Sequence, residues 1–403
     1  MFSQFSSERI LSVVQNLLSS ISSTKRSEYS ISNAVSLHYN TVQKPSGPRS
    51  ANSHISIFEQ EAFLKAVVCQ VKSGNAKGII DSLNQIRDAL IHAEKGFLAI
   101  STPIGKSAQS YVDEYSRQWF ACYEKYAENR GSEANGKSSN SVSGLSESAG
   151  KHPAFGKGGV FPIEYAKRSP DLEQPIQVHF PLASLQSSCV IMKMKNHTFC
   201  APTGKLSFEE ELQSLPALEY YAIYILAELI GRTDGFLYNA IRGKGFAYGA
   251  FIHPSLWTGQ LTFVCYRASD AARAILAMRQ LLHDIDVNWD RYINDFEISA
   301  ARSSIVYSNS SKMCTPINIV DHCISSNVYG FESASQYNRW RNVHFAAVGK
   351  KELRQAFDKY VKSFADPNYP LVTVFTSPPE AELLPEIGEF ERKTLESISE
   401  QYK

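Results

Sequence analysis

The sequence has little of what marks several large classes of protein. Its seven cysteines include no Cys-x-x-Cys pair, and the tightest spacing is that of Cys314 and Cys323. An odd, scattered set fits a reducing compartment better than a disulfide framework. No run approaches the roughly 18 apolar residues of a membrane span, and the N-terminus has no hydrophobic signal core. We therefore expect a cytoplasmic protein, or alternatively one of the mitochondrial matrix, with no membrane span.

Neither sign of charge is in excess. Lysine and arginine number 41 and aspartate and glutamate 40, so the net charge calls for neither nucleic acid nor an anionic membrane as a partner. The chain has 403 residues, of which 43% are apolar. That is enough to build the cores of two or three ordinary domains.

Closely spaced histidines are also absent. The two nearest in sequence, His38 and His54, are sixteen positions apart. Two imidazoles that bind one zinc from a helix lie three or four positions apart, so that both project from one face. No cysteine cluster offers an alternative, and we expect neither a metal nor another cofactor in this chain.

Four aspartates stand close together near an expected helix start, namely Asp284, Asp286, Asp290 and Asp295. The helix dipole and solvation suffice to explain them, because carboxylates are favourable near helix N-termini. A cation site is the alternative.

The first 26 residues are rich in serine and have an amphipathic pattern. One helical face carries Ile10, Leu11, Val14, Leu17, Leu18 and Ile21, as a core helix does. A mitochondrial transit peptide is the alternative, since Arg9, Lys25 and Arg26 outnumber the single acidic residue Glu8.

Periodicity predicts the remaining elements in order. Helices Ile57–Val71 and Ala76–Ala93 are followed by a strand at Phe97–Ser101 and a helix at Ala108–Glu128. Gly131–Gly150 holds seven serines, four glycines and no aromatic residue, which predicts a mobile linker. Beyond it we expect strands Ile176–Phe180 and Cys189–Met194, helix Ala217–Gly231, strand Gln260–Tyr266, three or four helices up to Phe364, and strand Leu371–Phe375.

This order is typical of an α+β architecture in which helices cover one face of a sheet. We divide the chain into residues 1–130, a flexible linker at 131–158, and a carboxy-terminal domain at 159–403.

The most informative segment runs from Gly235 to Ala250. Tyr238 and Ile241 have helical spacing, then Gly243 and Gly245 stop the helix and the next residues can enter a sheet. Such a turn, with Gly249 just beyond it, could aim Arg242 and Tyr248 at one point. From spacing alone, a surface arginine and a strand tyrosine remain the simpler interpretation.

With the helix before it and the strand Gly259–Ala268 after it, this segment resembles the insulinase/pitrilysin family of zinc metallopeptidases, most of all its presequence-protease branch. The resemblance covers about residues 205–285. It implies two related domains, each a mainly antiparallel sheet covered by helices. It also implies that Arg242 and Tyr248 bind the peptide substrate, supported by the turn residues Gly243, Gly245 and Gly249.

The family's zinc motif, His-x-x-Glu-His, is missing from this sequence. The resemblance therefore implies a carboxy-terminal, substrate-holding half of a peptide-degrading metalloendopeptidase, inactive alone. Its partner would be a zinc-bearing amino-terminal half, in the same full-length chain or in a separate subunit. The alternative is a non-catalytic subunit that uses the same fold for assembly.

Overall fold

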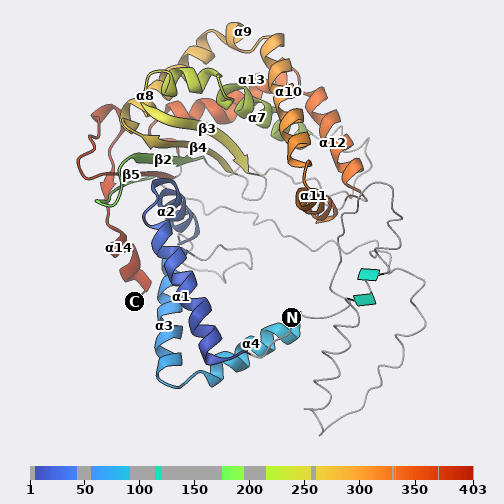
Figure 1. Cartoon of the computed structure of the whole chain (residues 1–403). Coiled ribbons are helices and arrows are strands. Elements are labelled where there is room, and N and C mark those ends of the chain that lie inside the picture. The colour runs from blue at the N-terminus through green and yellow to red at the C-terminus, as the bar shows by residue number, and fades with distance from the viewer. Residues whose placement is uncertain are drawn as a thin grey trace.

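The structure is a computed structural model and describes residues 5–42, 56–90, 114–115, 117–118, 175–194, 215–255, 260–328, 331, 333–370 and 372–402 (Figure 1). At its centre lies a six-stranded sheet with the strand order β3-β4-β2-β5-β1-β6. The strands are β1 (Ile176–Pro181), β2 (Ser188–Lys193), β3 (Ala247–Ser255), β4 (Gln260–Ala268), β5 (Val372–Ser377) and β6 (Glu391–Arg392). Every strand in the described part of the chain belongs to this sheet.

The sheet is mixed and mostly antiparallel. β3 pairs with β4, β4 with β2, and β2 with β5, all antiparallel, whereas β1 runs parallel to both β5 and β6. Strands predicted at Ile176–Phe180, Cys189–Met194, Gln260–Tyr266 and Leu371–Phe375 are confirmed to within two residues at either end. Runs of β-branched and aromatic residues are the signal that located them.

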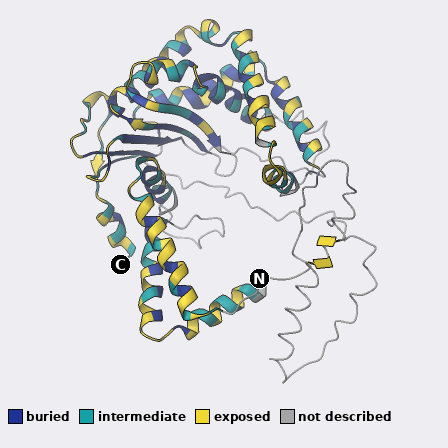
Figure 2. Cartoon of the chain, in the orientation of Figure 1, coloured by how far each residue is buried: buried dark blue, intermediate teal, exposed yellow. Residues whose placement is uncertain are grey.

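One face of the sheet packs on the main helical layer. The central helix α7 (Leu215–Gly231) contacts β3, α10, α12 and α13. It is apolar on nearly every side because it is surrounded: Ile223, Leu226 and Ile230 are completely buried. Val190 and Met192 of β2 and Phe263 of β4 point into the same core. Figure 2 shows that the strands are mostly buried, while the outer helices keep exposed faces.

The opposite face of the sheet is covered by α2 (Glu28–Val42), which contradicts the expectation of helices on one face only. Ile31 and Val35 of α2 pack with Val178 of β1 and Val374 of β5. Ser32 also hydrogen-bonds Thr376 of β5. The order of elements did not reveal this, because more than a hundred residues separate α2 from the first described strand.

Besides α2, the N-terminal region contains α1 (Ser7–Thr24), α3 (Ile57–Lys72) and α4 (Lys77–Leu90). α1 packs against α3 through Val14 and Val67, and Lys25 donates to Glu61 at 2.5 Å. The predicted core helix is confirmed, but its buried face is narrower than expected because Leu17 is 48% exposed.

Six α-helical segments, not three or four, follow β4 in the described part of residues 271–365: α8 (Ala271–Val287), α9 (Trp289–Tyr292), α10 (Asp295–Lys312), α11 (Pro316–Val328), α12 (Ala334–Ala347) and α13 (Lys350–Ala356). Short non-helical segments separate helices that the periodicity of apolar residues does not distinguish. Asn288 ends α8, and the Asn294 side chain accepts from Glu297 N–H at 3.0 Å to begin α10.

The chain then continues through η3 (Phe357–Val361), η4 (Lys362–Ala365) and η5 (Pro385–Ile387), and ends with α14 (Leu395–Ser399) and η6 (Glu400–Tyr402). No described helix is both long enough and apolar enough to cross a membrane.

Three predicted segments lie outside the described residues: the strand Phe97–Ser101, nearly all of the helix Ala108–Glu128, and the linker at 131–158. The division into two domains therefore stays a prediction.

Candidate functional site

The candidate site lies where the main helical layer meets the free edge of the sheet. After α7, a five-residue π-helix, η2 (Tyr238–Arg242), leads into edge strand β3. Leu237 and Ile241 are completely buried and anchor this short helix in the core. Arg242, the next residue, is exposed. π-helical turns are uncommon and recur at functional sites.

Two glycines make the reversal from η2 into β3 possible. The Gly243 N–H donates to the Tyr238 carbonyl at 2.9 Å, and a Cβ on Gly243 would lie 2.8 Å from the Asn239 carbonyl oxygen. Gly245 has φ of +77°, a left-handed conformation that glycine adopts without strain. The Ser269 hydroxyl donates to the Gly245 carbonyl at 2.9 Å and ties the turn to the start of α8.

This turn brings the two predicted site residues together. The Arg242 guanidinium carbon lies 4.5 Å from the Tyr248 ring centroid and 5.1 Å from that of Tyr238. Both distances are within the range of a cation–π contact. Tyr248 is 49% exposed. Neither the Arg242 guanidinium nor the Tyr248 hydroxyl forms a hydrogen bond or ion pair within the part of the chain that the structure describes.

Gly249 supports the site through close packing with an aromatic ring. It lies opposite Tyr266 on β4, and a Cβ on Gly249 would sit only 2.6 Å from that ring. The Tyr266 ring in turn meets Tyr248 edge-on at 6.0 Å and Tyr29 of α2 at 6.2 Å. The N-terminus of α2 is therefore adjacent to the site.

Arg267 is a site residue that the sequence analysis missed. Its guanidinium carbon lies 5.6 Å from the Tyr248 ring centroid, and its Nε is 3.9 Å from Glu28 of α2. The backbone of Arg267 has φ of +47°, and the pairing of β4 with β2 shifts register beside it. A bulge of this kind re-aims side chains. No sequence signal marks it, because arginine has no preference for this conformation.

Among the described residues, no group of three or more His, Cys, Asp or Glu side chains is placed to hold a metal ion. Two buried histidines lie elsewhere, His38 on α2 and His179 on β1. Burial lowers the pKa of His38 to about 4, and burial, followed by the charge of Arg392, lowers that of His179 to about 4. Their rings contact the hydroxyls of Tyr402 and Ser377, at 3.1 and 2.8 Å, so both act as neutral structural residues.

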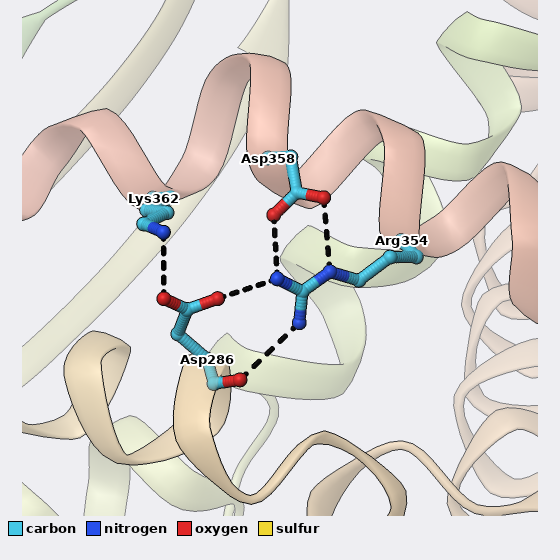
Figure 3. A network of polar contacts seen from close by, with 4 residues as sticks. All are labelled: Asp286, Arg354, Asp358 and Lys362. Carbon is cyan, nitrogen blue, oxygen red and sulfur yellow. Dashed lines mark hydrogen bonds and ion pairs between the residues drawn. The ribbon is translucent and has the colours of Figure 1, made fainter.

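Two aspartates of the acidic cluster, Asp286 and Asp295, form ion pairs. Asp286, near the end of α8, accepts from Arg354 and Lys362, both at 2.6 Å, and Arg354 also pairs with Asp358 at 2.8 Å (Figure 3). The hydrogen bond from Lys362 is the main reason that the pKa of Asp286 lies below its usual value. This network fastens α8 to α13 and the helical turns after it. Asp295 similarly pairs with Lys350 at 3.1 Å.

No family model matches the chain, and no curated protein does. Among solved structures, a protease from Helicobacter pylori is 15% identical, with 52% of this chain and 46% of that chain covered and a TM-score of 0.39. The peptidase M16 inactive domain from Pseudomonas fluorescens is also 15% identical, with coverage of 52% and 46% and a TM-score of 0.35.

The inactive peptidase domain of a putative zinc protease from Bordetella parapertussis is 14% identical, with 45% of this chain and 90% of that chain covered and a TM-score of 0.33. The chain thus spans less than half of the Helicobacter pylori protein. These are similarities in outline.

Proposed function

We propose that this chain is the substrate-holding, non-catalytic half of an insulinase-like zinc metalloendopeptidase of the presequence-protease type. Its ligand is a peptide, and its partner is a zinc-bearing amino-terminal half that carries the metal. The observation that supports this most is the contact of Arg242 with Tyr248, at 4.5 Å, on an exposed turn. Both side chains keep their hydrogen-bonding groups free of other described residues.

The chemistry of the two side chains fits a peptide carbonyl. A guanidinium has five N–H donors and no acceptor, and a phenol adds one O–H donor. The zinc of the partner half would supply the attacking water, and negative charge would then develop on the oxygen of the attacked peptide group. Fixed donors aimed at that oxygen stabilise the transition state without reorganising.

The simpler explanation, packing alone, accounts for less of the geometry. An exposed cation–π contact is worth about 0.5–1 kcal/mol and requires neither a π-helix nor a glycine turn. The turn brings together buried anchors, close-packed glycines and two exposed donor side chains that pair with no described residue. Uncommon backbone of this kind is typical of sites where ligands bind.

Peptide binding by the purified chain tests the proposal. We expect labelled extended peptides to bind, as measured by fluorescence anisotropy, and Arg242→Ala and Tyr248→Phe to weaken that binding. Lys244→Ala is the matched control, because Lys244 is exposed in the same turn but has no contact with the Tyr248 ring. If both variants keep their circular dichroism spectra and bind peptides as tightly as the original chain, the proposal is wrong.

A further inference from the structure

We propose that Arg267, beside Arg242 and Tyr248, binds a carboxylate of the peptide that those two residues hold, so that the site prefers an acidic ligand. This deepens the proposed function and rests on it. The geometry points to Arg267 because two arginines from different elements approach the same tyrosine ring. Arg242 comes from η2 at 4.5 Å, and Arg267 from β4 at 5.6 Å.

The two arginines that contact the Tyr248 ring have fewer carboxylate partners than guanidinium groups in the described part of the chain. Two guanidinium groups flank the ring, and the one carboxylate recorded in an ion pair with either is that of Glu28. Two positive charges and one negative charge leave one positive charge over. A carboxylate ligand carries one negative charge, which can pair with the guanidinium group that Glu28 leaves over.

Arg267 also keeps its donors available for a ligand. Its distance of 3.9 Å from Glu28 is an ion-pair distance and is too long for a hydrogen bond, which requires about 2.7–3.2 Å. No described residue accepts a hydrogen bond from the Arg267 side chain. Its side chain is 66% exposed, so a ligand can approach from solvent. A guanidinium can bind a carboxylate through two parallel N–H donors.

The backbone supports this role. A left-handed conformation is unfavourable for a non-glycine residue, yet Arg267 adopts it at φ of +47°. The next residue, Ala268, is 1% exposed and anchors the strand end in the core. The core therefore fixes a conformation that places the guanidinium beside Tyr248 rather than in regular strand alternation.

The test compares labelled peptides that differ by one charge. One pair contains a single Glu or Gln in otherwise identical sequences, and a second pair ends in a free or an amidated carboxyl group. We expect the original chain to bind the charged member about two- to fivefold more tightly, as suits an exposed ion pair. A preference within the first pair identifies a side chain as the source, and one within the second pair identifies the C-terminus.

Three variants decide whether Arg267 is responsible. Arg267→Gln should abolish the preference while neutral peptides still bind. Arg273→Gln is the matched control, because Arg273 is 64% exposed and should leave the preference unchanged. Glu28→Gln should change it in the opposite direction, making acidic peptides bind more tightly, because a competing carboxylate is removed.

The outcomes separate this inference from the proposed function. Equal affinities for charged and neutral peptides, or a preference that survives in folded Arg267→Gln, would overturn the role of Arg267 alone. If no peptide binds, or if Arg242→Ala leaves the affinity for peptides unchanged, the proposed function is wrong as well.

Discussion

Gly249 and Tyr266 lie opposite each other on β3 and β4, and the tyrosine ring occupies the space that a Cβ on the glycine would need. The ring is held there by Tyr29 from α2 and by Phe251 and Tyr248 from β3. One glycine therefore allows an aromatic cluster to link α2 to the edge of the sheet beside Arg242.

Gly249→Ala should destabilise the protein, because the added methyl group would lie 2.6 Å from a ring that has neighbours on several sides. Overpacking of this kind typically costs about 1–3 kcal/mol. Urea unfolding measures the loss. Gly78→Ala in α4 is the control, since its Cβ would meet nothing within 4 Å and alanine favours helix. An unchanged unfolding midpoint for Gly249→Ala would show that the ring moves aside freely.

Replacing Asp286 by Asn should weaken the attachment of α8 to α13. The loss should be about 1 kcal/mol, because its partners Arg354 and Lys362 are 35% and 49% exposed and water screens the pairs. Asp290→Asn is the control, since Asp290 is exposed and takes part in no recorded ion pair of the described chain. Equal unfolding free energies for Asp286→Asn and Asp290→Asn would show that the ion pairs of Asp286 do not stabilise the protein.

The same aspartate should add to acid sensitivity. Its pKa in the folded protein lies below the ordinary value of 3.8, so its stabilising contribution is present above that value. The contribution is lost as the pH falls through the lower, folded-state pKa. Unfolding measured from pH 6 downward should therefore show a smaller loss below pH 4 for Asp286→Asn than for the original chain. Parallel curves for the two proteins would contradict the assignment.

His179 should make stability depend on pH in a higher range. Its pKa is about 4 in the folded protein, below the ordinary 6.5, so between these values the unfolded chain binds more protons. Stability should then be highest above pH 6.5 and fall toward pH 4, by at most about 1.4 kcal/mol per pH unit for this group. His179→Asn should flatten the slope even if it lowers stability overall. An unaltered slope would show that the buried ring does not titrate as described.

If activity can be reconstituted with a zinc-bearing half, Arg242→Ala and Tyr248→Phe should each lower turnover. Removing one donor to a developing oxyanion typically costs about a hundredfold to a thousandfold. Lys244→Ala should cost far less, because Lys244 shares the turn but not the contact with Tyr248. Steady-state kinetics on peptides gives the comparison. Full turnover by both folded variants would mean that these residues do not meet the substrate.

Local patterns in the sequence predicted much of the sheet. Alternating or continuous apolar runs located β1, β2, β4 and β5, and the apolar run after Ala217 located α7. Gly243 and Gly245 marked the turn, because glycine is the residue that such backbone requires. These features depend on residues close to one another in the chain.

Long-range placement could not be predicted in this way. Nothing in residues 28–42 indicates that α2 covers the far face of a sheet formed by strands from Ile176 onward. The positive φ of Arg267 arises from a bulge between β4 and β2, which depends on the pairing of two strands rather than on the arginine itself. Glu28 and Tyr29 adjoin the site for the same reason, and only the fold shows it.

The position of α2 has a consequence for how the protein could be divided. Its residues Ile31, Ala34 and Val35 fill one side of the sheet, against Val178 and Val374. If the polypeptide were cut within 131–158, the second piece would keep every described strand but lose this cover. The two pieces should therefore stay associated after cleavage without a covalent link, as in fragment complementation, and the second piece alone should expose an apolar surface and aggregate.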